Sequence, residues 1–88
     1  MRLKYKFILS SVNGKFCAVT VGDDRDKYKS LLKMNSTSAY IFELLYNDIS
    51  FDEIVDRLYD KYQCDISILR ERTTDFIQIL RKENLITE

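Results

Sequence analysis

The 88-residue sequence contains no histidine, no proline and no tryptophan. Without histidine, the side chain that most often serves as a general base near neutral pH is missing. No Gly-x-Gly-x-x-Gly or Gly-Lys-Ser/Thr segment offers a loop for phosphate groups. The sequence therefore predicts a protein that is not an enzyme and that holds no cofactor.

Only two cysteines are present, and Cys17 and Cys64 lie far apart in the sequence. They form no Cys-x-x-Cys pair, and no histidine is there to complete a zinc site. We interpret both as packing residues, because a chain without secretion signals usually meets reducing conditions. A disulfide between them is the alternative.

Long apolar runs are also missing. No segment approaches the ~20 apolar residues of a membrane span, and the N-terminus alternates charged and apolar side chains where a signal peptide would be continuously apolar. We expect a cytoplasmic protein with no membrane partner. The length fits a single domain over residues 1–88, and the apolar fraction of 45% is that of a globular chain.

The N-terminal third has the pattern of antiparallel strands. Leu3, Tyr5, Phe7 and Leu9 are apolar at every second position, which predicts a first strand with one buried face. The Asn-Gly pair at residues 13–14 tolerates positive φ at both centres of a tight turn, so residues 16–21 should fold back as a second strand. Residues 22–26 are the next predicted turn.

A third strand is predicted over residues 28–34. It places Tyr28, Ser30, Leu32 and Met34 on one face and Lys29, Leu31 and Lys33 on the other. The first and third strands are then the edges of a three-stranded meander. An open edge presents unpaired backbone donors and acceptors, which a protein must hide or use to capture another peptide.

Helices follow the predicted sheet. Asn35 or Ser36 can cap the first, and residues 39–46 are apolar apart from one glutamate, which predicts a buried central helix. Ser50 and Glu53 have the spacing of a capping box at the start of the second helix. The apolar stripe of the second helix comprises Phe51, Ile54, Val55, Leu58 and Tyr62.

Ser67 can cap a third helix that runs to about Glu83. Its core stripe comprises Leu69, Thr73, Phe76, Ile77 and Leu80. A second line about a quarter-turn away comprises Ile68, Arg72, Asp75 and Ile79. Leu85 and Ile86 should fold back under the sheet as a closing strand or cap. The predicted fold class is α+β, winged-helix-like, with a three-stranded antiparallel sheet followed by three α-helices.

Charge is balanced overall, with 14 basic and 14 acidic residues, but it is unevenly distributed. Residues 1–33 hold eight basic and three acidic side chains, whereas the largely helical residues 34–88 hold six basic and eleven acidic ones. In helix-turn-helix proteins the helices meet DNA phosphates, so this distribution is the wrong way round for DNA binding. No nucleic-acid partner is predicted.

Two acidic clusters have both a metal-binding and a structural interpretation. The recurrence of Asp52, Asp56 and Asp60 at helical spacing favours a solvated helix face over a metal-binding face. The acidic segment 23–26 resembles a fragment of a calcium loop but lacks its later glycine and glutamate, which favours an ordinary turn.

Tyr28 lies among lysines on the predicted edge strand. A binding role and a structural role are equally favoured for it.

Taken in order, these elements resemble the PqqD family over nearly the whole chain. The matching pattern is a Leu-x-x-Asn step, small residues, and an Ile-x-x-Leu-Leu helix, followed by apolar positions in the second and third helices. Its positions here are Leu32, Asn35, residues 36–39, Ile41, Leu44, Leu45, Ile54, Leu58, Tyr62, Asp75, Phe76, Leu80, Leu85 and Ile86. Many members place a glycine after the first helix, where this chain has Tyr46-Asn47-Asp48-Ile49.

The resemblance implies a non-catalytic module that recognises the leader of a ribosomally made precursor peptide. Such a module presents the leader to a modifying enzyme, often a radical S-adenosylmethionine (SAM) enzyme, as in coenzyme PQQ biosynthesis or another pathway to a modified ribosomal peptide. The leader adds as a strand to the third strand and lies against the third helix. Carried over, the peptide-binding residues are Tyr28, Lys29, Ser30, Leu31, Leu32, Ile68, Arg72, Asp75 and Ile79.

Strand addition takes affinity from main-chain hydrogen bonds and specificity from pockets for alternate side chains. Because Lys27, Lys29 and Lys33 flank the expected site, the leader should carry acidic residues between apolar anchors. Two alternatives remain open. One is a winged-helix DNA-binding or transcription-related module, although the third helix carries as many acidic as basic residues between Asp65 and Glu83. The other is a weak homodimer through the open edge.

Overall fold

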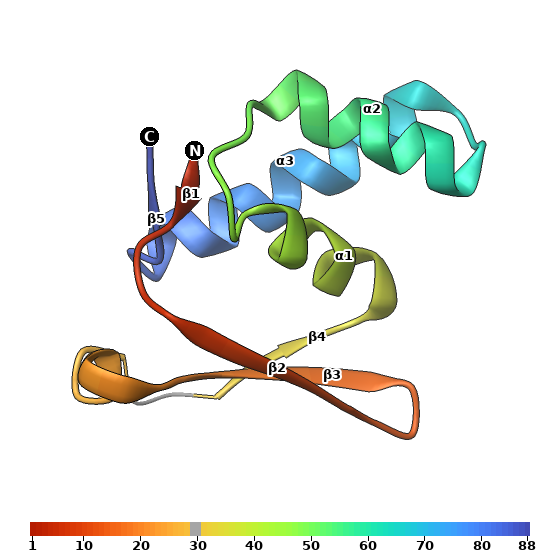
Figure 1. Cartoon of the computed structure of the whole chain (residues 1–88). Coiled ribbons are helices and arrows are strands. Elements are labelled where there is room, and N and C mark those ends of the chain that lie inside the picture. The colour runs from red at the N-terminus through yellow and green to blue at the C-terminus, as the bar shows by residue number, and fades with distance from the viewer. Residues whose placement is uncertain (29–30) are drawn as a thin grey trace.

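The computed structural model of the chain describes residues 1–28 and 31–88. Within these residues a three-stranded antiparallel sheet is followed by three helices, so the predicted α+β class is confirmed. Figure 1 shows the sheet on one side of the molecule and the helices on the other, with α1 between the sheet and the remaining helices. The helices are α1 (Ser36–Leu44), α2 (Phe51–Tyr62) and α3 (Ile66–Lys82).

The sheet has the order β2-β3-β4, with β2 at Phe7–Val12, β3 at Lys15–Thr20 and β4 at Leu32–Met34. The predicted hairpin turn is present between β2 and β3, where Asn13 has φ 54° and Gly14 has φ 76°. Two consecutive residues with positive φ make a tight turn whose twist matches that of the flanking strands. Val12 therefore pairs directly with Lys15.

The prediction of one continuous first strand was wrong. Instead, β1 (Arg2–Leu3) pairs with the C-terminal strand β5 (Ile86–Thr87) in a separate two-stranded sheet, and the chain enters the main sheet only at Phe7. The backbone N–H of Lys4 donates to the carbonyl of Leu85 over 2.8 Å. Side chains keep alternating through the break, so the period-2 pattern does not reveal it.

The C-terminal residues close the fold, as predicted, but they pair with β1 in a separate sheet and do not lie under the main sheet. Leu85 and Ile86 are both buried, and Ile86 pairs with Leu3. The backbone N–H of Leu3 also donates to the carbonyl of Leu45 over 2.8 Å, which ties β1 to the end of α1. The small β1-β5 sheet thus lies beside the helices and apart from the main sheet (Figure 1).

The third strand is shorter than the predicted span of residues 28–34. In the described residues β4 covers only Leu32–Met34, and Tyr28 and Leu31 lie outside it. Lys29 and Ser30 of the predicted strand lie outside the described residues.

The helix caps explain where each helix begins. Asn35 Oδ1 accepts the backbone N–H of Ser38 at the start of α1, and the predicted capping box at Ser50 is present at the start of α2. For α3 the predicted cap was wrong: Asp65 is the cap, and α3 begins at Ile66. Aspartate is as good a cap as serine, and its carboxylate accepts from both the backbone and the side chain of Ser67.

A single core joins the sheet to all three helices. Phe42 of α1 is fully buried and meets the ring of Phe7 edge-on, with ring centroids 5.0 Å apart. The predicted core stripe of α3 is entirely buried. Of the predicted stripe of α2, Ile54, Val55 and Leu58 are buried, Phe51 is partly buried, and Tyr62 is 37% exposed. Cys64 is exposed, so its interpretation as a packing residue was wrong.

We expect Phe42→Ala to lower the free energy of unfolding by about 3–5 kcal/mol, because it removes a buried ring and leaves a cavity between α1 and the sheet. Urea denaturation measures this loss. Tyr59→Ala is the matched control, since Tyr59 is 43% exposed on α2, and it should cost less than about 1 kcal/mol. Equal losses in the two variants would contradict the central position of Phe42.

Candidate functional site

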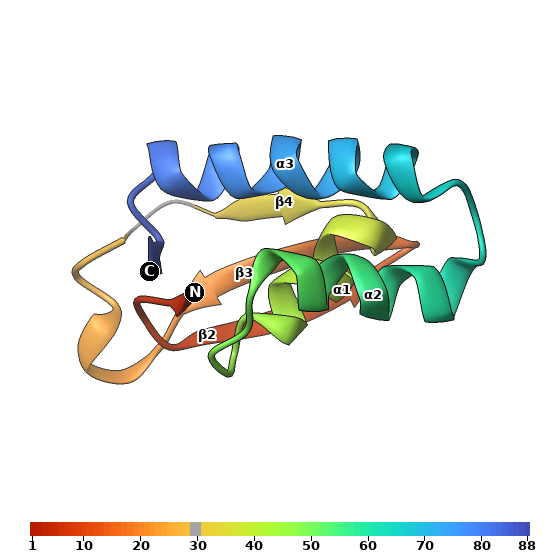
Figure 2. The same ribbon diagram turned by 90° about the horizontal axis from the view of Figure 1, so that it is seen from above.

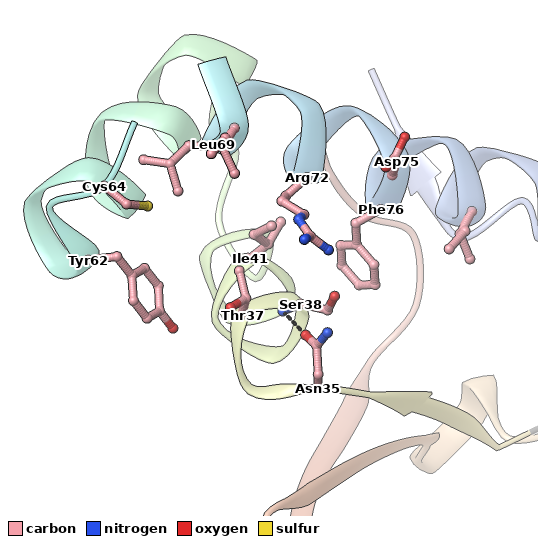
Figure 3. Close-up of a pocket in the computed structure, with 12 residues that line it drawn as sticks. Asn35, Thr37, Ser38, Ile41, Tyr62, Cys64, Leu69, Arg72, Asp75 and Phe76 are labelled. Carbon is pink, nitrogen blue, oxygen red and sulfur yellow. Dashed lines mark hydrogen bonds between the residues drawn. The ribbon is translucent and has the colours of Figure 1, made fainter. Parts of the chain in front are cut away.

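A groove lies between α3 and the junction of β4 with α1. Its volume is about 560 Å³. We call it the α3 groove, and its 12 lining residues, drawn in Figure 3, are Asn35, Thr37, Ser38, Ile41, Tyr62, Cys64, Ile68, Leu69, Arg72, Asp75, Phe76 and Ile79. It is partly open to solvent, so a chain segment could enter it.

One wall of the α3 groove is the second line predicted on the third helix. Ile68, Arg72, Asp75 and Ile79 all line it. Ile68 and Ile79 are 50% and 51% exposed, so each presents apolar surface to any occupant. The core residues Leu69 and Phe76 lie at the base of this wall. Helical periodicity therefore placed these four residues together correctly, and their binding role stays a prediction.

The opposite wall comes from the beginning of α1. Asn35, Thr37 and Ser38 lie there with Ile41 deeper in the groove (Figure 3). We had interpreted Asn35 as a helix cap, which it is, and had assigned it no place in a site. The only sequence signal was the run of small polar residues at 36–38, which lets an occupant approach the helix backbone closely.

The open edge of β4 lies next to this groove. Seen from above (Figure 2), α3 runs parallel to β4 on the side away from β3, and Figure 1 shows that it lies above the sheet with the other helices. Within the described residues β4 has β3 as its one neighbour, so its other edge carries no strand. We call the open edge of β4 and the α3 groove together the slot, because Asn35, the residue that follows β4, lines the groove.

The register of the hairpin identifies the backbone groups at this edge. In a two-residue hairpin the flanking pair, Val12 and Lys15, exchanges hydrogen bonds, and hydrogen-bonded pairs then alternate along the strands. Phe16 and Ala18 therefore direct their backbone groups toward β4, where they pair with Met34 and Leu32. It follows that Lys33 directs its N–H and C=O away from β3, into the open edge.

The structure places the predicted strand residues unequally. Tyr28 is partly buried, its ring lies 6.1 Å from that of Phe7, and its carbonyl accepts the hydroxyl of Thr20 over 2.7 Å. Burial, and then the charge of Glu83, raise the pKa of Tyr28. These contacts favour the structural role of the tyrosine side chain.

Leucines 31 and 32 differ in exposure. Leu32 packs partly against the core and pairs with Ala18, whereas Leu31 is 49% exposed. Neither is among the lining residues of the α3 groove. Lys29 and Ser30 are outside the described residues, so the binding role predicted for this segment stays a prediction.

The cation of the α3 groove is Arg72. Its guanidinium points into the groove beside Phe76 (Figure 3) and forms no ion pair with any described residue. The lysines expected to flank the site are placed differently. Lys27 pairs with Asp24 at 3.5 Å, and Lys33 is exposed on the face of the sheet opposite the buried Met34. Within the described part of the chain, the positive charge that lines the groove thus comes from the helix.

The described residues hold no group of three or more His, Cys, Asp and Glu side chains placed to bind a metal ion. Cys17 and Cys64 are both free thiols; Cys17 is partly buried on β3 and Cys64 is exposed in the α3 groove. Among the described helices, none has the length and apolar character needed to span a bilayer.

Comparison with known proteins gave two matches. Residues 17–86 match the protein family described as "Coenzyme PQQ synthesis protein D (PqqD)". A solved structure described as "TbiB1 in Complex with the TbiA(beta) Leader Peptide" has the same fold, with a TM-score of 0.74 and 18% sequence identity, covering 100% of this chain and 98% of that one. No match was found among the curated proteins.

The wall of the groove should lose stability in acid through its helix cap. Hydrogen bonds from the Ser67 side chain and then its backbone lower the pKa of Asp65. A lowered pKa in the folded state stabilises the fold above the pKa of the unfolded chain, and this contribution disappears as pH falls through the folded value. Asp65→Ala should therefore melt below wild type at neutral pH, and the difference should narrow below about pH 4.

Thermal melts monitored by circular dichroism, from neutral pH to below about pH 4, measure how the difference in melting temperature between Asp65→Ala and wild type narrows. Asp56→Ala, which removes an exposed carboxylate that caps no helix, is the control and should show no such convergence. A melting difference for Asp65→Ala that is constant with pH would contradict the role of the carboxylate.

Proposed function

This chain belongs to the PqqD family, and we propose that it is a non-catalytic module that binds the leader of a ribosomally synthesised precursor peptide. In this proposal the leader adds as a strand to the open edge of β4, lies in the α3 groove, and is presented to a modifying enzyme. A radical SAM enzyme is the partner we expect, in coenzyme PQQ biosynthesis or in another pathway to a modified ribosomal peptide.

The observation that carries the proposal is the slot itself. The unpaired edge of β4 leads through Asn35 to a groove that is walled by the amphipathic helix α3 and has apolar side chains at its base. Peptide recognition by strand addition needs these two parts, since the edge binds main chain and the wall distinguishes side chains. The likeness to TbiB1 supports the same conclusion, because that protein is described in complex with a leader peptide.

The expected affinity is moderate. Ordering a disordered peptide costs about 2–5 kcal/mol, which must be subtracted from the contacts that the peptide makes in the slot. Micromolar binding corresponds to about 8 kcal/mol at room temperature. An affinity in this range would hold the leader while an enzyme acts and would still allow release.

DNA binding by α3 has little support in the charges of that helix. Of its four basic residues, Arg70 pairs with Asp52 and Arg81 pairs with Glu88. Arg72 faces the α3 groove, where a duplex could not follow it. A gel-shift experiment with duplex DNA at low salt provides the comparison: strong retardation would favour the DNA-binding alternative.

Cysteine labelling tests whether a leader occupies the groove. The probe is a synthetic leader from any short precursor reading frame that sequencing finds next to the gene of this protein. We expect it to slow alkylation of Cys64, because Cys64 is an exposed lining residue. Cys17 is the internal control, since it lies on β3 and outside the groove, and its labelling rate should not change. Mass spectrometry of the two cysteine peptides over time gives both rates. Binding that leaves Cys64 unprotected would place the leader elsewhere.

A proline at the open edge tests strand addition. Lys33→Pro removes the backbone N–H that faces the edge and spares the pairing of Leu32 and Met34 with β3. We expect it to weaken leader binding at least about ten-fold, given the lost donor and the steric conflict of the ring with an incoming strand. Lys33→Ala is the matched control, because it removes the same side chain and keeps the N–H.

Isothermal titration of the leader measures both variants, and circular dichroism checks that each is folded. Equal binding by Lys33→Pro and wild type would contradict strand addition at β4. Sedimentation of the free protein addresses the remaining alternative: a dimer that Lys33→Pro dissociates would show that the same edge also pairs with a second copy.

A further inference from the structure

We infer that the α3 groove selects a bound strand with the pattern apolar-x-acidic-x-apolar, in which the acidic side chain meets Arg72. This inference rests on the proposed function and adds the chemistry of the ligand. Among the described residues Arg72 is the one basic residue that lines the groove, and it has no carboxylate partner there. An arginine pointing into a partly apolar groove binds a carboxylate well, because its planar donor fork matches the two oxygens.

The spacing of the pattern follows from comparing the distances between groove residues along the helix axis with the repeat of side chains on one face of a strand. Ile68 and Arg72 are four residues apart on α3, which places them about 6 Å apart along the helix axis. Side chains on one face of a strand repeat every two residues, at about 6.6–6.8 Å. A strand lying along α3 therefore brings an apolar side chain to Ile68 and, two residues away, a second side chain to Arg72.

The third position of the pattern is set by Asp75 and Ile79. Along the helix axis they lie about 4.5 Å and 10.5 Å beyond Arg72, so the next inward side chain of the strand reaches the space between them. A second acidic residue there would meet the carboxylate of Asp75, whereas an apolar residue would cover the exposed surface of Ile79. Because the pattern is symmetrical, it holds for a strand of either direction.

The cations on the sheet do not substitute for Arg72. Lys33 is exposed on the opposite face of the sheet, and Lys27 already pairs with Asp24. A general attraction between basic residues and an acidic peptide would depend only on net charge. Selection by Arg72 instead depends on which face of the strand carries the carboxylate, and this difference makes the inference testable.

Three acetylated synthetic peptides are the probes, each with the same polar flanks. The first is centred on Leu-Thr-Glu-Thr-Leu, the second on its isomer Leu-Glu-Thr-Thr-Leu, and the third on Leu-Thr-Gln-Thr-Leu. The isomer has the composition and charge of the first but directs its carboxylate to the opposite face of the strand. We expect the first peptide to bind about five-fold more tightly than either of the others, which is typical of a partly exposed ion pair.

Substitutions of Arg72 test whether this residue causes the preference for the first peptide. In Arg72→Gln the first and third peptides should bind equally, and Arg72→Glu should instead prefer a fourth probe, Leu-Thr-Lys-Thr-Leu. Arg70→Gln is the matched control, since Arg70 lies on the same helix outside the groove and pairs with Asp52. It should keep the five-fold preference of wild type.

Alkylation of Cys64 in the presence of each peptide separates this inference from the proposed function. If the peptides slow alkylation and the first and second bind equally, selection by Arg72 is overturned while peptide binding in the groove stands. If the first peptide is preferred and Arg72→Gln retains the preference, the inference is also overturned. If none of the peptides binds or slows alkylation of Cys64, both the inference and the proposed function fail for strands of this class.

Discussion

The site depends on a single constraint, the direct passage of the chain from β4 into α1 through Asn35. The backbone of Asn35 is extended, with φ −84° and ψ 178°, while its side chain accepts a backbone N–H from the first turn of the helix, that of Ser38, over 2.8 Å. Met34 on one side and Ala39 on the other are buried, so both ends of this junction are fixed in the core. The helix turns away over the sheet, and the edge of β4 stays open.

The third helix completes the site by using two adjacent faces for two purposes. Leu69 and Phe76 hold it against the core, while Ile68 and Arg72 lie about a quarter-turn away in the groove. Core packing of Leu69 and Phe76 therefore fixes the position of the helix without using Ile68 or Arg72. Substitutions of Ile68 or Arg72 should cost the fold little. Under the proposed function, this separation would let one scaffold bind different peptides.

Local signals predicted most of this fold, and long-range backbone pairing accounts for the main error, the break in the predicted first strand. The Asn13-Gly14 turn and the Ser50 capping box each involve neighbouring residues, so their chemistry is visible in the sequence. The break between β1 and β2 depends on Lys4 bonding to Leu85, which no local pattern encodes. In the site, helical periodicity identified one wall. The other wall was missed because the same polar residue types can cap a helix or line a binding site. In the sequence, the residues at the start of α1 indicated only the cap.

The β4 edge and the side chains of the α3 groove would contribute differently to the free energy of peptide binding. Within β4, Lys33 alone directs its backbone groups outward, so the strand itself offers about two hydrogen bonds to an added peptide. At about 0.5–1.5 kcal/mol each, these cannot supply the ~8 kcal/mol of micromolar binding, still less offset the ordering of the peptide. In the proposed complex the edge would therefore mainly fix the register and direction of the peptide. Most of the affinity, and with it the choice between peptides, would come from side chains that cover Ile68 and Ile79 and meet Arg72.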